Sequence, residues 1–126
     1  MLLTDSSAAT FYFDLETTGL NPYADSIIEI GISTSDGNHT LSILIQPPYP
    51  ISPQVEYITG ITQSTLDTEG TDLKRALRAL HAFIRTHTRN SKQKVWLIGH
   101  NSIGFDRIFY LQAMKQVNMR PLRPSI

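Results

Sequence analysis

Two segments of the 126-residue chain carry acidic residues where acids could do chemistry. In the first, Asp14 and Glu16 end an apolar run that begins at Phe11 and is typical of a buried strand. Side chains alternate along a strand, so both carboxylates are expected on one side and Leu15 on the other, in the core. Neighbouring carboxylates repel each other unless a cation neutralises them, and their oxygens suit Mg²⁺ or Mn²⁺. For this pair alone, two solvated acids at a partly exposed strand end are the favoured interpretation.

The second segment is LIGHNSIGFD at 97–106, where a buried strand leads through a glycine-containing turn to Asp106. Asp106 stands in the first turn of an expected helix, where an acid can also simply complement the helix dipole. It is nevertheless the one acid among residues 73–126, which favours a functional position. His100 and Asn101 are expected to order the turn rather than to react.

The charges divide along the chain. Residues 1–72 carry ten acids and no Lys or Arg, whereas residues 73–126 carry all eleven Lys and Arg and one acid. The two halves could pair across the fold, or they could form a basic face for a polyanion beside an acidic pocket for metal. The basic residues that form either a solvated face or a phosphate track are Lys74, Arg75, Arg78, Arg85, Arg89 and Lys92.

Length and composition set further bounds. A chain of 126 residues fits one domain with a core of its own, and its 40% hydrophobic and 17% charged residues are typical of a soluble globular protein. It has no apolar run long enough for a membrane span, and its first residues do not resemble a signal peptide. The absence of cysteine excludes disulfides, thiolate metal sites and a cysteine nucleophile, and agrees with an intracellular protein.

Hydrophobic periodicity predicts the elements that must position the acids. Strands are expected at 11–15, 26–34, 38–45 and 95–98, with a hairpin turn at Asp36-Gly37. Prolines stiffen the connector at 47–53, short helical turns follow within 54–72, and helices are expected at 73–86 and 105–117, with His81 and His87 on the surface of the first. We therefore expect an α/β fold with a central mixed sheet, in which strand 11–15 lies between the hairpin and strand 95–98, both central strands being covered on both faces.

Together the two segments resemble the DnaQ-like, DEDD-type 3′→5′ exonucleases. FDLETTGL at 13–20 is similar to that family's first motif, HN at 100–101 with FD at 105–106 is similar to its second, and ITGIT at 58–62 matches a loop between them. The residues SP at 52–53 and the sequence IGHN at 98–101 favour the three-prime repair exonuclease branch, which works in DNA repair. The resemblance covers about 10–117, and it implies one exonuclease-like domain over 1–126 with an RNase H-like fold.

The resemblance also implies an activity: metal-dependent hydrolysis of nucleic-acid phosphodiester bonds from single-stranded 3′ ends, with DNA favoured over RNA. Asp14 would bridge two Mg²⁺ ions, Glu16 would hold the ion that carries the attacking water, and Asp106 would serve the other ion, with Mn²⁺ as a substitute. Apolar contacts would hold any base; for Leu20 and Ile58, ordinary packing is the open alternative. The residues implied in nucleic-acid binding are Leu15, Thr17, Leu20, Ile58 and Phe105.

One part of the family's pattern is absent. The third motif, His-x4-Asp or Tyr-x3-Asp, supplies a general base and a fourth carboxylate, and neither an acid nor a histidine follows Asp106. The chain is therefore expected to be a C-terminally incomplete exonuclease domain: a fragment, a domain completed by another chain, or a degenerate one. The alternatives are a catalytically dead nucleic-acid-binding or assembly module of the same fold, and a structural interaction domain.

The hairpin predicts a site of self-association. Strand 41–45 is expected at the sheet edge with Leu41, Ile43 and Ile45 on one face, and an unpaired apolar edge invites strand pairing. The branch that the chain resembles forms dimers through such an edge. We therefore expect a homodimer through 41–45, and no membrane partner.

Overall fold

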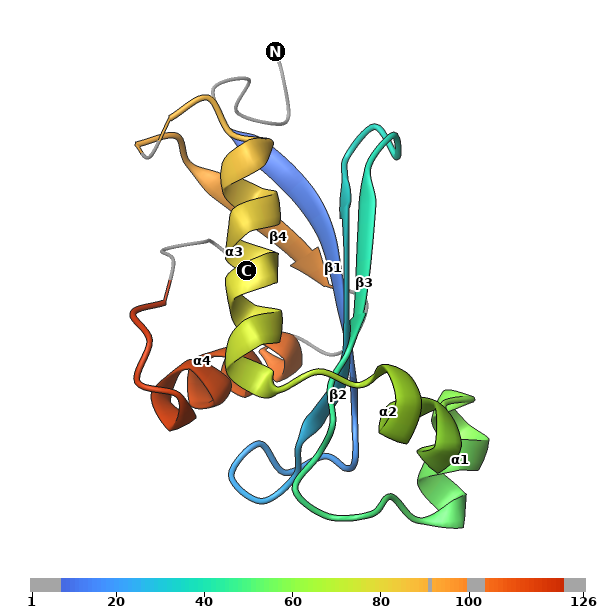
Figure 1. Cartoon of the computed structure of the whole chain (residues 1–126). Helices are drawn as coiled ribbons and strands as arrows, with labels where there is room; N and C mark the ends of the chain where they lie inside the picture. The colour runs from blue at the N-terminus through green and yellow to red at the C-terminus, as the bar shows by residue number, and fades with distance from the viewer. Residues whose placement is uncertain (1–7, 91, 100–103, 122–126) are drawn as a thin grey trace.

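The computed structural model describes residues 8–90, 92–99 and 104–121. Figure 1 shows a sheet with two of the helices, α3 and α4, packed on one side of it. The predicted order of strands and helices is confirmed, and none of the helices in the described ranges is long and apolar enough to cross a membrane. The strands and helices are β1 (Ala9–Thr17), β2 (Ile27–Thr34), β3 (Thr40–Leu44), α1 (Pro53–Thr59), α2 (Gln63–Glu69), α3 (Leu73–Thr86), β4 (Val95–Gly99) and α4 (Phe105–Gln116).

The strands form a mixed sheet in the order β3-β2-β1-β4. β1 pairs antiparallel with β2 and parallel with β4, so it lies between the hairpin and β4 as predicted. The hairpin turns at Gly37, whose φ of 76° lies in the left-handed region that glycine adopts without strain. Helix α3 precedes the parallel neighbour β4 in the chain, and a parallel pair such as β1 and β4 needs a long connection of this kind rather than a tight turn.

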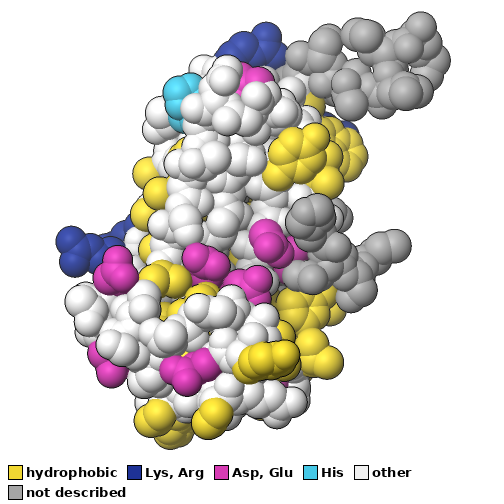
Figure 2. All heavy atoms as spheres, turned by 90° about the vertical axis from the view of Figure 1, so that its right-hand side faces the viewer, with side chains coloured by type: hydrophobic (Ala, Val, Ile, Leu, Met, Phe, Trp, Pro, Cys, Tyr) yellow, Lys and Arg dark blue, Asp and Glu magenta, His cyan; other side chains and the backbone are white. Residues whose placement is uncertain are grey.

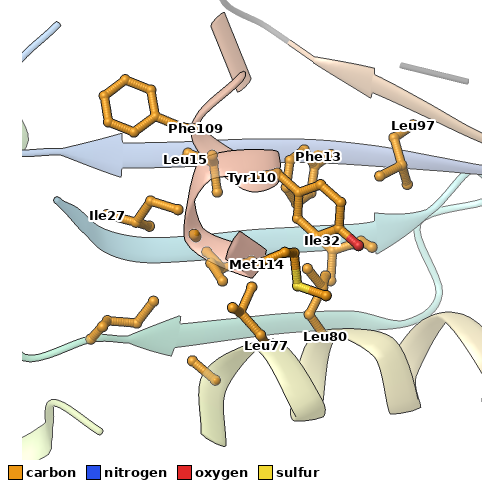
Figure 3. Close-up of a cluster of buried hydrophobic side chains, with 14 of the residues drawn as sticks. Phe13, Leu15, Ile27, Ile32, Leu77, Leu80, Leu97, Phe109, Tyr110 and Met114 are labelled. Atoms are coloured by element: carbon orange, nitrogen blue, oxygen red, sulfur yellow. The ribbon is translucent and has the colours of Figure 1, made fainter. Parts of the chain in front are cut away.

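The core lies on one face of this sheet. Alternation along β1 sends Phe11, Phe13 and Leu15 toward the helices, where each is at most 3% exposed. They pack there against Leu77 and Leu80 of α3 and against residues of α4 (Figure 3). Because neighbouring side chains on a strand point to opposite faces, the intervening residues of β1 point away from α3 and α4. We call that side of the sheet the open face; Tyr12, Asp14 and Glu16 lie on it.

We expected both faces of the central strands to be covered, and for the described residues this is wrong. On the open face Tyr12 of β1 is 52% exposed, and Trp96 and Ile98 of β4 are 37% and 48% exposed. Tyr12 pairs with Ile98 across the two strands, and Lys94 Nζ lies 4.7 Å from the centre of the Trp96 ring. A short apolar run indicates a strand, but it does not reveal how many of its faces are covered.

The edge strand β3 also differs from expectation. It lies at the sheet edge as predicted, but Leu41 and Ile43 pack against the core and Ile45 is buried. The reason is the register: Leu41 pairs with Ile32, and Ile43 pairs with Ile30, both of which are buried. The apolar side chains are therefore not offered to a second copy. A homodimer through 41–45 would use the backbone edge alone, and it stays a prediction.

The expectation that His81 lies on the surface of its helix is wrong. Its side chain is 4% exposed, and Nε2 lies 2.8 Å from the hydroxyl oxygen of Tyr110 in α4. Burial, and after it the nearby charge of Arg85, lowers the pKa of His81 to about 4. A neutral imidazole therefore links α3 to α4 inside the core. His87, the C-cap of α3, is half-buried rather than exposed.

Helix α3 begins at an acidic cap, and this gives a first testable expectation. Asp72 Oδ1 accepts a hydrogen bond from the backbone N–H of Arg75 at 2.9 Å. Replacing Asp72 by alanine should lower the free energy of unfolding by about 1 kcal/mol, because that N–H loses its acceptor. Urea denaturation measures the change. Asp72→Asn keeps an acceptor and should stay near wild type, so equal stabilities of the two variants would contradict the role of the cap.

Candidate active site

The acids of β1 lie near the C-terminal end of that strand, on the open face. Asp14 and Glu16 are both half-buried. Figure 2 looks onto this face and shows acidic side chains gathered near its middle, with hydrophobic groups on either side of them. The two carboxylates thus share one side of the strand, as their spacing predicts.

Helix α4 brings Asp106 to the same end of the sheet. The helix begins after Gly104, whose φ of 89° turns the chain sharply, and Asp106 in its first turn is 4% exposed. Gly99, the last residue of β4, pairs with Phe13, the neighbour of Asp14. A Cβ built on Gly99 would lie 2.6 Å from Oδ2 of Asp106. The carboxylate of Asp106 therefore occupies the space that the glycine leaves, directly beside the strand that carries Asp14.

The carboxylates at this end of the sheet act on one another. Burial raises the pKa of Glu16, and the charges of Asp14, Glu29 and Asp106 raise it further. Glu29 of β2 is the direct cross-strand partner of Glu16, and one of its oxygens accepts a hydrogen bond from Ser42 Oγ at 3.0 Å. A group of acids that raises the proton affinity of one member also favours a bound cation.

Glu29 and Gly99 are the two site residues that sequence reasoning missed. A signal for Glu29 was present in β2, where it alternates with Ile30 and Ile32 and so must face away from the core. The contact of Gly99 with Asp106 depends on how α4 returns over the end of the sheet. That is a tertiary arrangement, and local spacing carries no signal for it.

The donor chemistry fits a hard divalent cation. Asp14, Glu16 and Asp106 would offer carboxylate oxygens, which are the ligands that Mg²⁺ and Mn²⁺ prefer. No group of three His, Cys, Asp or Glu side chains within the described ranges is already arranged to hold a metal ion.

A pocket of about 500 Å³ opens beside Glu16. Leu20 and Ile58 border it and are 84% and 69% exposed, which argues against ordinary packing as the reason for their apolar side chains. The pocket runs from the end of β1 to α1 and to the start of α4. All five residues predicted to bind nucleic acid line it: Leu15, Thr17, Leu20, Ile58 and Phe105.

Local hydrogen bonds shape the loop that presents Leu20. Thr17 Oγ1 donates to the carbonyl oxygen of Gly19 at 2.6 Å, and the backbone N–H of Asn21 donates to Asp25 Oδ2 at 2.9 Å. A side chain at position 19 would collide with the Asp25 carboxylate, which would then have to move away from the backbone N–H of Asn21. His100 and Asn101, expected to order the turn before α4, lie outside the described residues.

A comparison with protein families gives one match across nearly the whole chain. The family described as "RNase_T: Exonuclease" matches residues 11–124. This span includes both acidic segments and every strand of the sheet except the first two residues of β1.

Curated relatives are bacterial DNA polymerases. The chain is 32% identical over 125 residues to the PolC-type DNA polymerase III of Ureaplasma parvum, covering 95% of the chain and 8% of that relative. It is 48% identical over 66 residues to the PolC-type enzyme of Thermotoga petrophila, covering 47% of the chain and 5% of the relative. The chain thus spans less than a tenth of the length of these relatives. They give no support to the expected three-prime repair branch.

Solved structures of exonuclease I share the fold. A product-bound exonuclease I superposes with a TM-score of 0.74 at 19% identity, covering 94% of this chain and 29% of that one. Exonuclease I of E. coli in complex with a dA16 oligonucleotide superposes with a TM-score of 0.71 at 19% identity, covering 90% and 25%. The expected RNase H-like α/β fold is confirmed. With the family match, these findings show that the chain belongs to the DnaQ-like RNase T family of exonucleases.

Proposed function

We propose that this 3′→5′ exonuclease domain removes nucleotides from the 3′ ends of single-stranded DNA with the help of divalent metal ions, and that the described residues form one such domain. One observation carries the proposal. The acids of β1 and α4 meet at one end of the open face, beside the pocket that Leu20 and Ile58 border. Reacting groups and a place for the terminal nucleotide are thus neighbours.

The pocket residues would hold the end of the strand. Leu20 and Ile58 offer apolar contact to the terminal bases without reading their identity. Backbone groups around Thr17 and the ring of Phe105 would surround the terminal sugar. Asp14, Glu16 and Asp106 would hold two divalent ions, which when bound activate a water and stabilise the leaving oxygen. The neighbouring negative charges that contribute to the raised pKa of Glu16 would also attract a divalent cation to this carboxylate.

The choice of DNA rests on the relatives. The curated ones are DNA polymerases, and one exonuclease I structure of the same fold is a complex with a DNA oligonucleotide. We therefore place the domain with exonucleases that work beside DNA synthesis rather than with the three-prime repair branch.

A digestion assay tests the proposal. A 5′-labelled single-stranded oligonucleotide, incubated with the chain and Mg²⁺ or Mn²⁺, should give a ladder of products shortened from the 3′ end, and a chelator should stop it. Asp14→Asn should give no ladder. If neither metal yields products while the oligonucleotide still binds, the chain is the catalytically dead nucleic-acid-binding module that the absent third motif leaves open.

The two exposed pocket residues should affect substrate binding more than stability. Leu20→Ala and Ile58→Ala should each raise KM about tenfold, because an apolar contact with a base contributes roughly 1–3 kcal/mol. Their thermal denaturation should match wild type, since neither side chain is in the core. Tyr57→Ala, an equally exposed residue of α1 that does not line the pocket, is the matched control. An unchanged KM in both pocket variants would exclude this placement of the strand end.

A further inference from the structure

A second charged surface lies on α3. Lys74, Arg78 and Arg85 are all exposed, and at 3.6 residues per turn their positions fall within about 40° of one another around the helix. We call these three residues the basic face. Arg75, also exposed, lies beside it.

The positive charges of the basic face are not neutralised by the acidic half of the chain. None of the three residues has an ion-pair partner in the part of the chain that the structure describes. Residues 73–105 contain no acid, and the carboxylate of Asp106 is buried beside Gly99 at the end of β4. The interpretation that the two halves simply pair across the fold therefore fails at these residues.

The basic face is separate from the candidate active site. α3 packs on the face of the sheet that Phe11, Phe13 and Leu15 share, whereas Asp14 and Glu16 point to the opposite face. Figure 1 shows α3 on the far side of the sheet from the open face. In Figure 2, which looks onto the open face, basic side chains appear only toward the outline of the molecule. A ligand of the basic face would thus not occupy the cutting site.

We propose that the basic face binds the phosphate backbone of nucleic acid at a second surface, away from the cutting site. Lys74 and Arg85 are eleven residues apart, so the face is about 16 Å long at 1.5 Å per helical residue. One strand of duplex DNA presents a phosphate about every 3.4 Å along its axis, so about five phosphates fit along this length. Two of the three side chains are arginines, which can donate two parallel hydrogen bonds to one phosphate.

This inference rests on the proposed function only in taking nucleic acid as the polyanion. A membrane surface does not fit, because a helix that lies on a bilayer inserts its apolar side, and that side of α3 is already in the core. An acidic protein segment shares the charge but not the regular spacing of phosphates. It is therefore an outcome of the test rather than a part of the proposal.

The test measures binding without cutting. A fluorescent 20-base-pair DNA duplex is titrated with the whole 126-residue chain in EDTA at several salt concentrations. The variant Lys74→Glu/Arg78→Glu leaves Arg85 intact, since that charge also acts on His81. The matched control is Lys115→Glu/Arg120→Glu, which makes the same change of charge at two exposed positions on and after α4.

If the basic face binds phosphates, the α3 variant should weaken duplex binding at least tenfold. The negative slope of log K against log salt should become less steep by about 2, because each lost phosphate contact removes about 0.9. The control should change affinity less than threefold. Equal losses in both variants, or no loss in either, would overturn the proposal. So would a poly-glutamate peptide that binds the wild type more tightly than DNA does.

A cleavage assay separates this proposal from the function on which it rests. An oligonucleotide of three nucleotides can fill the pocket but cannot also reach the far side of the sheet. The α3 variant should cut it at the wild-type rate, and a loss of this activity would place the basic face in the cutting machinery and contradict a second surface. If neither the wild type nor any variant cuts, and the α3 variant alone loses duplex binding, the proposed function is wrong and the second nucleic-acid surface is supported.

Discussion

The 126-residue chain is expected to shorten a 3′ end about 10²–10⁴-fold more slowly than a typical enzyme, whose rate is on the order of 1 s⁻¹ or faster. The reason is the chemistry absent after Asp106, where neither an acid nor a histidine follows. A positioned general base contributes roughly 10²–10⁴ to the rate, and a missing carboxylate leaves one bound ion short of a ligand. Single-turnover digestion of a labelled oligonucleotide, with Mg²⁺ and then with Mn²⁺, measures the rate.

Two variants make this expectation sharp. Asp14→Asn should remove the residual cutting, whereas Asp67→Asn, an exposed acid of α2, should leave it unchanged. A wild-type rate of about 1 s⁻¹ or more that Asp14→Asn abolishes would show that another group completes the site. His87, His100 or a residue of a second chain would then be the groups to replace next.

Acid is expected to destabilise the fold through His81. Its pKa is lowered to about 4 in the folded chain, mainly by burial, whereas an unfolded histidine titrates near 6.5. Between these values the unfolded state binds more protons, so stability falls as the pH falls from about 6.5 to about 4 and is unaffected above that range. The shift corresponds to about 2 kcal/mol after allowance for partial solvation. Tyr110 from α4 and Arg85 on its own helix are the groups that face the imidazole.

Urea denaturation at pH 7, 6 and 5 tests this expectation against a variant. His81→Gln keeps a polar group near the Tyr110 hydroxyl but does not titrate, so its stability should change less over this range. The difference between wild type and His81→Gln removes the contribution of the carboxylates, including Glu16, whose raised pKa acts in the opposite direction. A difference that does not vary with pH would show that His81 is not buried in its neutral form.

The local sequence pattern was sufficient to predict the helices and strands. α3 runs over the predicted residues because its apolar stripe and the cap at Asp72 are both encoded within one stretch of chain. The alternation that places Asp14 and Glu16 opposite Leu15 is equally local, and so the acids of β1 could be assigned to one face from sequence.

Long-range arrangement was not predictable in the same way. His81 lies four residues after Leu77 and three before Ile84, so its spacing places it beside the apolar stripe, and only its polar side chain suggested the surface. Tyr110, which is 29 residues away, gives it a buried partner that no local pattern reveals. The register between β2 and β3 turned Leu41 and Ile43 into the core rather than outward. The exposure of Trp96 and Ile98 depends on what lies over β4, and a run of four apolar residues is the same in sequence whether one face of the strand is covered or two.

The division of β1 between its two faces has an evolutionary consequence. Phe11, Phe13 and Leu15 hold the sheet to its helices, whereas Asp14 and Glu16 lie outside the core and repel their acidic neighbours. Their loss would therefore leave the fold intact or make it slightly more stable, as is common where function requires strained or repelling groups. Under the proposed function, selection for cutting would be the force that retains these two acids. In a lineage where binding alone is useful, they would drift first, while Phe11, Phe13 and Leu15 stayed fixed.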